Sequence, residues 1–311
     1  MMQRTDSKSP WWKRRHAQRL VNWREQFEST IELDAYPDPG EPIMSVNDNV
    51  LSIRNASHNI RSVYFLPWVI GLWLCSFWLY NDIKPGEIET NYALHRMEII
   101  DAGGRSAGPN EYKLHSTMLG TNGKVQWPSY IKAIMMYGDK SDKKHLIQTL
   151  TIVSVVAIIT VLFTFLLIRF PRLAEIYFDR QRGIVYTWRF GKMAACRFEN
   201  LGFREDKIGL TLFLYGESKK HESGYWPALY GLQPTGKAHM NSEDDNTFLM
   251  AQLFAFMDRG KQAVITGEQF QRAQPKTYLF QDNKPKNFEK RLEAILEREH
   301  QLPEIYAEQT F

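Results

Sequence analysis

Two long apolar runs interrupt a chain that is otherwise mostly polar. The first run, Val63–Tyr80, holds eighteen residues without a charge, and the second, Ile147–Ile168, holds twenty-two. At about 1.5 Å per helical residue, these lengths approach and then exceed a hydrocarbon core of about 30 Å. Each run is therefore predicted to be a transmembrane helix. For the shorter run, a buried helix of a soluble domain is the alternative.

Aromatic residues mark the ends of the first run, and basic residues flank the second. Tryptophan and tyrosine rings prefer the membrane–water interface, and arginine limits a span at its polar end. Neither run contains an ionisable side chain, which argues against a proton relay or an ion-coupled transporter. The spans are thus interpreted as an anchor. Their predicted interfacial residues are Tyr64, Trp68, Trp78, Tyr80, Arg169 and Arg172.

Two spans leave residues 1–62 and 169–311 on the same side of the bilayer. Six basic residues flank the spans on each side, so the positive-inside rule does not choose between the orientations. Residues 1–24 lack the apolar core of a cleavable signal peptide, and exporting residues 81–146 moves the least chain. We therefore predict a multi-pass membrane protein with both termini cytoplasmic.

Residues 9–31 have the pattern of one amphipathic helix, with Ser9 as cap and Pro10 in the first turn. A basic helix with tryptophan on its apolar side is suited to an anionic leaflet. The alternative is a helix that packs on the C-terminal domain. Residues 36–42 are rich in proline and are predicted to be a linker, so residues 1–62 form a helix and a linker. The predicted membrane-surface residues are Trp11, Trp12, Lys13, Arg14, Arg15, Arg19 and Trp23.

Residues 81–146 contain turn clusters at 84–86 and 103–109, with short apolar pieces between them. This extracytoplasmic loop could form a small ordered domain with a marginal core, or it could stay close to the membrane surface.

Residues 169–311 have the alternation of strands, followed by helical patterns. A glycine-containing turn at 180–183 predicts a hairpin, and Ser242 caps a helix that ends at Gly260. The predicted class is an α+β membrane protein, with two transmembrane helices and a cytoplasmic antiparallel β domain closed by a helix. Strands followed by a closing helix are also the order of pleckstrin-homology-like domains. Strands are predicted at 173–179, 184–190, 194–198, 210–215 and 225–232, and helices at 246–259 and 288–300.

Composition and the absence of known motifs exclude several classes of function. The 39 basic and 35 acidic residues leave a net charge of +4, which is not the local basic excess of a nucleic-acid-binding domain. Cys75 lies inside an apolar run and Cys196 in the predicted soluble domain, so no disulfide between them is expected. The sequence contains no Walker loop, nucleophile elbow or zinc motif, so no enzyme, cofactor or metal site is predicted. Some hydroxyl side chains of the two runs could form hydrogen bonds between the helices, although ordinary helix composition also explains their presence. They are those of Ser76, Ser154, Thr149, Thr151 and Thr160. A homo-oligomer remains an alternative.

The hairpin Ile176–Arg189, IYFDRQRGIVYTWR, followed by Cys196-Arg-Phe-Glu199, resembles a known family. It is similar to uncharacterised bacterial two-span inner-membrane proteins with a strand-rich C-terminal domain, often encoded near type VI secretion effectors. The resemblance covers about residues 60–260 and supplies no catalytic residue.

This resemblance implies a role in competition between bacteria. We predict a non-enzymatic immunity protein against a membrane-active toxin, which would meet the toxin through residues 81–146 or a groove between the spans. The partners are then the bilayer and a protein, either a cognate effector or a secretion component. Two alternatives stay open: a tethered adaptor that binds a protein through its cytoplasmic β domain, and a membrane-active effector.

Overall fold

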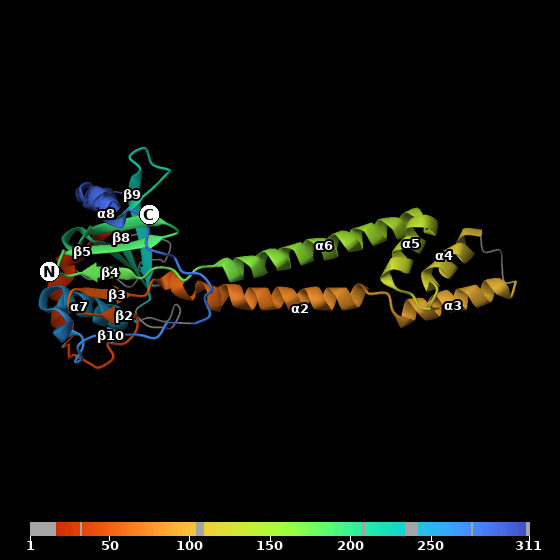
Figure 1. The fold of residues 1–311 in the computed structure, drawn as a ribbon, viewed down its shortest axis with the longest axis horizontal. Coiled ribbons are helices and arrows are strands. Elements are labelled where there is room, and N and C mark those ends of the chain that lie inside the picture. Colours follow the sequence, from red (N-terminus) through yellow and green to blue (C-terminus); the bar gives the residue numbers. More distant parts are fainter. Residues whose placement is uncertain are drawn as a thin grey trace. The chain divides into compact units, whose positions relative to one another are not determined.

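The computed structural model describes residues 17–31, 33–103, 109–206, 209–233, 242–274 and 276–308 of the 311. The chain forms two compact units. The first, called the sheet domain, combines residues up to 60 with residues from 169 onward. The second, called the helical unit, is residues 61–168. Figure 1 draws the elements of both units.

The sheet domain is an antiparallel sheet, in which the order of the described strands is β1-β7-β8-β6-β5-β4-β3-β2-β10, with β9 on β8. An isolated bridge between Asn55 and Leu232 brings the end of β9 toward the residues that follow β3. The strands are β1 (Gln18–Arg19), β2 (Ile43–Val46), β3 (Val50–Ile53), β4 (Ile176–Asp179), β5 (Ile184–Arg189), β6 (Lys192–Arg197), β7 (Gly202–Asp206), β8 (Gly209–Glu217), β9 (Tyr225–Leu232) and β10 (Phe270–Gln271).

The helical unit is inserted between two paired strands. Strands β3 and β4 are antiparallel neighbours, with Ile53 opposite Ile176 and Leu51 opposite Phe178. The chain that connects these neighbours therefore leaves the sheet domain, forms the whole helical unit and returns to the same place in the sheet.

In the described part of the helical unit, residues 61–103 and 109–168, there are two long apolar helices and three shorter ones. The predicted spans at 63–80 and 147–168 fall in α2, preceded by a π-helical turn at Arg61–Phe65, and in α6. The loop predicted at 81–146 is largely helical and has its own small apolar cluster. The helices are α2 (Leu66–Ile83), α3 (Glu87–Asp101), α4 (Pro109–Leu119), α5 (Trp127–Tyr137) and α6 (Lys140–Arg169).

Helices cover both faces of the sheet. On one face, Phe254 of α7 (Glu243–Arg259) packs on Phe198 and on Phe27 of α1 (Arg24–Thr30). On the other face, Phe288 of α8 (Phe288–Leu296) packs edge-on against Tyr186 of β5. Figure 1 shows α7 and α8 on opposite sides of β4 and β5. Helix α9 (Leu302–Glu308) follows α8 and lies beside β7 and β8.

The local signals of the C-terminal region are confirmed. Ser242 accepts a hydrogen bond from the Asp245 amide and begins α7, which ends at Gly260 with φ +85°. Gly183 closes the β4–β5 turn with φ +65°. The second predicted helix is shorter than expected, because α8 ends at Leu296 and a 3-10 turn follows at Glu299–Gln301.

The prediction of a separate N-terminal helix and linker over residues 1–62 is wrong for the described residues. Where one helix was expected over 9–31, residues 18–30 form β1, a 3-10 turn at Leu20–Trp23 and α1. Leu20 and Phe27 are fully buried in the sheet domain's core. The reason is physical: the apolar stripe needs an apolar partner, and the exposed face of the sheet provides one. Strands β2 and β3 also lie in this region.

Two of the predicted membrane-surface residues can be placed. Arg19 lies in β1 opposite Gly202, and the Trp23 ring packs edge-on against Phe203 at 5.8 Å. Both therefore belong to the sheet domain rather than to a separate surface helix. The other five predicted residues lie outside the described ranges: Trp11, Trp12, Lys13, Arg14 and Arg15.

Candidate membrane anchor and its neck

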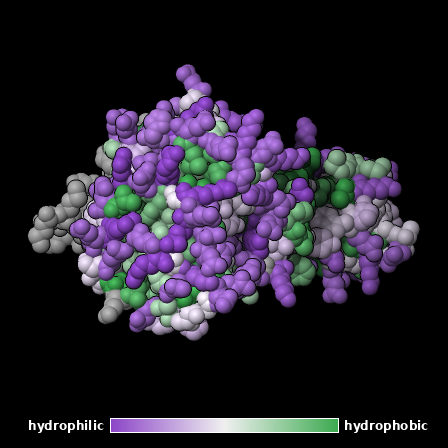
Figure 2. Space-filling model, turned by 60° about the vertical axis from the view of Figure 1, so that its left-hand side comes forward, coloured by the Kyte–Doolittle hydropathy of each residue, from purple (hydrophilic) through white to green (hydrophobic). Residues whose placement is uncertain are grey.

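Helices α2 and α6 expose apolar side chains along most of their length. By length and composition alone, they are the two described helices that could cross a membrane. The 30 residues of α6 extend about 45 Å, which is more than the hydrocarbon core requires. The predicted anchors Tyr64, Trp68, Trp78 and Tyr80 are all exposed. In Figure 2, apolar side chains show on the helices, whereas the visible face of the sheet domain is mainly polar.

Polar contacts join α2 to α6. The Ser76 hydroxyl lies 2.9 Å from that of Thr160, and the Trp73 indole Nε1 donates to Thr164 Oγ1 at 3.1 Å. Thr160 is buried between the helices. The structure thus pairs two of the hydroxyl residues that ordinary composition was also able to explain. Thr151 instead donates within its own helix, to the carbonyl oxygen of Ile147.

The two chain ends that enter the helical unit are held together by one segment. We call residues 58–60 and 169–172 the neck, and residues 278–282 the bracket. The Tyr278 hydroxyl donates to the His58 carbonyl oxygen at 2.7 Å. Four residues further on, Asp282 donates its amide to the Arg172 carbonyl, and Arg172 donates its own amide to the Phe280 carbonyl, both at 2.9 Å. The bracket therefore fixes the neck on both sides.

Asp282 ties a third segment to the bracket. Its carboxylate accepts from the Phe190 amide at 2.7 Å, and its carbonyl accepts from the Trp188 indole at 2.8 Å. Asp282 is itself buried, so these bonds form away from water, where an unsatisfied carboxylate would be costly. The β5–β6 turn at residues 189–192 is thereby held beside the neck.

His58 is a buried neutral base in the neck. It precedes the apolar span and packs in the sheet domain near the Tyr278 ring. Burial disfavours the imidazolium, and the positive charges of Arg54 and Arg172 add to this, so the pKa of His58 is lowered to about 4. Its neighbour Asn55 is also buried, because its side chain caps the Ala56–Asn59 turn by accepting from Ser57.

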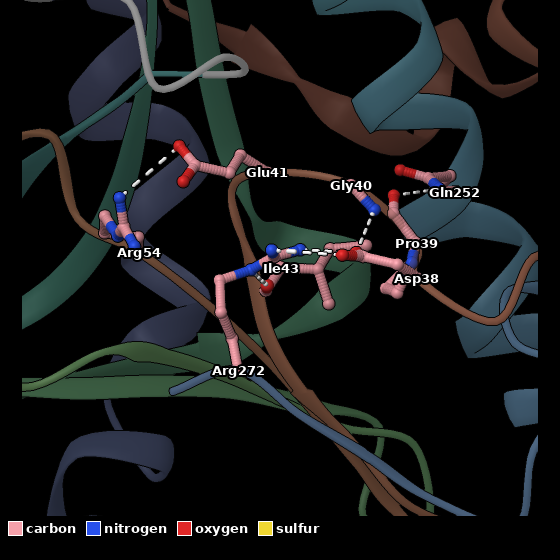
Figure 3. Close-up of polar contacts among 8 residues, drawn as sticks. All are labelled: Asp38, Pro39, Gly40, Glu41, Ile43, Arg54, Gln252 and Arg272. Atoms are coloured by element: carbon pink, nitrogen blue, oxygen red, sulfur yellow. Dashed lines mark hydrogen bonds and ion pairs between the residues drawn. The ribbon is translucent and has the colours of Figure 1, made fainter. Parts of the chain in front are cut away.

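A second group of contacts ties the N-terminal strands to the C-terminal region (Figure 3). The Arg272 guanidinium, which follows β10, binds the Asp38 carboxylate at 2.5 and 3.2 Å and donates to the Ile43 carbonyl at 3.0 Å. The hydrogen bond from Arg272 lowers the pKa of Asp38. From α7, Gln252 donates to the Pro39 carbonyl at 3.0 Å. These contacts of Arg272 and Gln252, which we call the clamp, hold the proline-rich stretch at residues 36–42 against the rest of the sheet domain.

A short chain of hydrogen bonds between polar side chains also connects β3 to residues that lie far along the sequence. The Ser52 hydroxyl of β3 donates to Glu175 Oε2 at 2.6 Å, and Gln274 donates to Glu175 Oε1 at 2.8 Å. Ser52 is fully buried. Residues from three distant parts of the sequence thus satisfy one another at the end of the sheet that carries the neck.

The helices between α2 and α6, α3 to α5, form what we call the cap. Ala93, Met118 and Ala133 pack in its small core, and Arg96 pairs with Glu111 between α3 and α4. Apolar side chains also remain on its outside: Ile88 is 82% exposed and Met136 57% exposed. The cap is thus the small ordered domain that was one of the two interpretations of this loop.

The bracket and the clamp are the parts that sequence reasoning missed. Their contacts join residues more than ninety positions apart, and no local sequence pattern reports such contacts. The one signal was the apolar triplet Tyr278-Leu279-Phe280 in a polar stretch. Among the described residues, no group of three or more histidine, cysteine, aspartate or glutamate side chains could hold a metal ion. No family model, curated protein or solved structure matches the chain.

Proposed function

We propose that this chain is a two-span protein of a bacterial inner membrane that acts by binding another protein rather than by catalysis. The single observation that carries the anchor is the pairing of β3 with β4 on either side of the helical unit. Because residues before α2 and after α6 share one sheet, both must occupy the same side of the bilayer. Export of the shorter intervening segment then leaves both termini in the cytoplasm.

The cap is the element that we assign to the partner. In this topology it lies outside the inner membrane, where an incoming membrane-active toxin arrives first. Its exposed Ile88, Tyr92, Met135 and Met136 give it the apolar and methionine-rich surface typical of protein interfaces. The uncharged spans support an anchor for this surface rather than a conduit.

The proposed function is immunity against a membrane-active toxin associated with type VI secretion. The family resemblance of the β4–β5 hairpin and the exposed apolar surface of the cap support this proposal. A cognate effector is the expected partner, with the bilayer as the second contact and no nucleic acid involved.

Co-expression with the effector encoded beside this gene tests the proposal. We expect the wild-type chain to restore growth of cells that export the toxin, and Ile88→Lys with Met136→Lys to abolish the rescue. The matched control is Leu229→Lys, which changes an exposed apolar residue of β9 in the sheet domain. Equal killing with and without the wild-type chain would refute immunity. Loss of rescue through Leu229→Lys alone favours the adaptor, and killing by this chain alone favours the effector.

A further inference from the structure

The two turns at the ends of β5 differ sharply in chemistry. The β4–β5 turn, Arg180-Gln-Arg-Gly183, is polar and exposed. The β5–β6 turn carries Phe190, whose side chain is 61% exposed and whose φ is +50°. A bulky residue in the left-handed region is strained, and such strain persists where the residue has a purpose. Glycine or asparagine would be ordinary at this position.

Chain connectivity decides which of these turns lies near the bilayer. Six residues separate the last residue of α6 from the first residue of β4, and antiparallel β5 returns toward that start. The β5–β6 turn is therefore at the neck end of the sheet, and the β4–β5 turn is about 20 Å away at the other end of β5. The Phe190 ring contacts that of Phe170, the residue directly after α6, at 6.4 Å.

The bracket adds two exposed apolar side chains at the same end. Leu279 is 71% and Phe280 40% exposed, and the Arg169 guanidinium lies 4.8 Å from the Phe280 ring. Their backbone is fixed to the neck at Arg172, and Asp282 fixes the Phe190 turn to the bracket. Hydrogen bonds thus join the two segments that carry these three apolar side chains to one another and to the neck.

The charges around this surface suit an anionic lipid headgroup region. Arg169, Lys192 and Lys284 are exposed near it, and Lys284 lies 4.0 Å from Glu289. Of the carboxylates near the β5–β6 turn, that of Asp282 is buried and accepts from the Phe190 amide, and that of Glu217 accepts from the Met193 amide and pairs with Arg291. Aromatic rings combined with basic side chains are the composition of an interfacial anchor.

We propose that Phe190, Leu279 and Phe280 form a seat by which the sheet domain rests in the headgroup region of the cytoplasmic leaflet. The occupant is lipid, because the surface is continuous in the chain with a helix that ends at the membrane. The seat rests on the proposed two-span anchor.

Fluorescence quenching in vesicles tests the seat. The full chain would carry Cys75→Ala and either Phe190→Cys or Leu279→Cys, labelled with an environment-sensitive dye, because the remaining Cys196 is buried. Gln181→Cys, at the opposite end of β5, is the matched control. In vesicles of phosphatidylethanolamine and phosphatidylglycerol with nitroxide headgroup lipids, we expect severalfold stronger quenching at positions 190 and 279 than at 181.

Two outcomes would overturn separate parts of the argument. If alkaline carbonate leaves the protein in the vesicles but all three sites are quenched equally, the seat is refuted and the anchor stands. If carbonate extracts the Cys75→Ala parent, the two-span anchor itself is refuted. The seat would also be refuted if the dye at position 190 were shielded from solvent in native membranes but not in vesicles that contain only lipid and this protein. The occupant would then be another protein.

Discussion

At the scale of single residues, the Phe190 side chain is expected to contribute to the proposed membrane contact but little to the stability of the fold. A non-glycine residue in the left-handed region costs about 1 kcal/mol, and the exposed ring gains little from packing within the domain. We therefore expect Phe190→Gly to keep the unfolding free energy or raise it by up to about 1 kcal/mol, while Phe190→Val lowers it. Thermal unfolding in detergent, followed by tryptophan fluorescence, measures both. Marked destabilisation by glycine would mean that the ring packs in the core after all.

His58 makes a prediction about pH. Its folded pKa of about 4 lies below the ordinary value of 6.5, so the unfolded state binds the proton more tightly. Stability is then complete above pH 6.5 and falls as the pH drops toward 4, by a total on the order of 3 kcal/mol. Unfolding measured across this range should be less pH-dependent in His58→Gln than in the wild type. The pKa of His115 is also lowered, and the comparison of the two proteins removes its contribution.

At the scale of elements, the Arg272 clamp tests how the proline-rich stretch is held. Arg272→Lys keeps the charge but loses the planar fork that reaches both Asp38 and the Ile43 carbonyl, so we expect a loss of about 1–2 kcal/mol. Asp38→Asn should cost less, below about 1 kcal/mol, because the Asp38 side chain is 59% exposed and its ion pair is screened. Urea unfolding gives both values. Equal losses would mean that the bond to Ile43 contributes nothing.

The elements that the sequence predicts are those with local signals. Each of three features is predicted from a few neighbouring residues: the start of α7 at Ser242, its end before Gly260 and the glycine turn at 183. All three are confirmed. Strands β2 and β3 were missed, although Asn47 between them folds its side chain onto the amides of Asn49 and Val50. Four-residue strands carry too little periodicity to be recognised alone.

The partner of an amphipathic pattern cannot be deduced from the pattern itself. The stripe that includes Leu20 and Phe27 satisfies the requirements of a membrane-surface helix and of a core-packing segment equally well. The structure buries both residues in the core of the sheet domain, where Phe27 packs on Phe203 of β7 and Phe254 of α7, both far along the chain. The same limit hid the bracket, whose Tyr278 meets His58 across 220 positions.

At the scale of the whole molecule, the sheet domain is one folding unit made from two separate pieces of sequence. We expect a chain with residues 61–168 replaced by a short glycine–serine linker to fold as a soluble monomer, because β3 and β4 already lie side by side. Residues 171–311 alone should fail to fold, since they lack the buried Leu20, Phe27 and Leu51. Circular dichroism and gel filtration compare the two. A well-folded 171–311 fragment would contradict the shared core.

The pairing of β3 with β4 also has a consequence for biosynthesis. Residue 53 leaves the ribosome long before residue 176, and at about 5–20 residues per second the interval is roughly 6–25 s. During that time the edge of β3 that later pairs with β4 is unpaired, and both apolar helices, which the proposed topology places in the bilayer, are made before β4. On that topology, a chain in which only one of the two helices inserts leaves its two halves on opposite faces of the membrane, with β3 unable to pair with β4. Pairing of β3 with β4 therefore requires that both helices, or neither of them, cross the membrane.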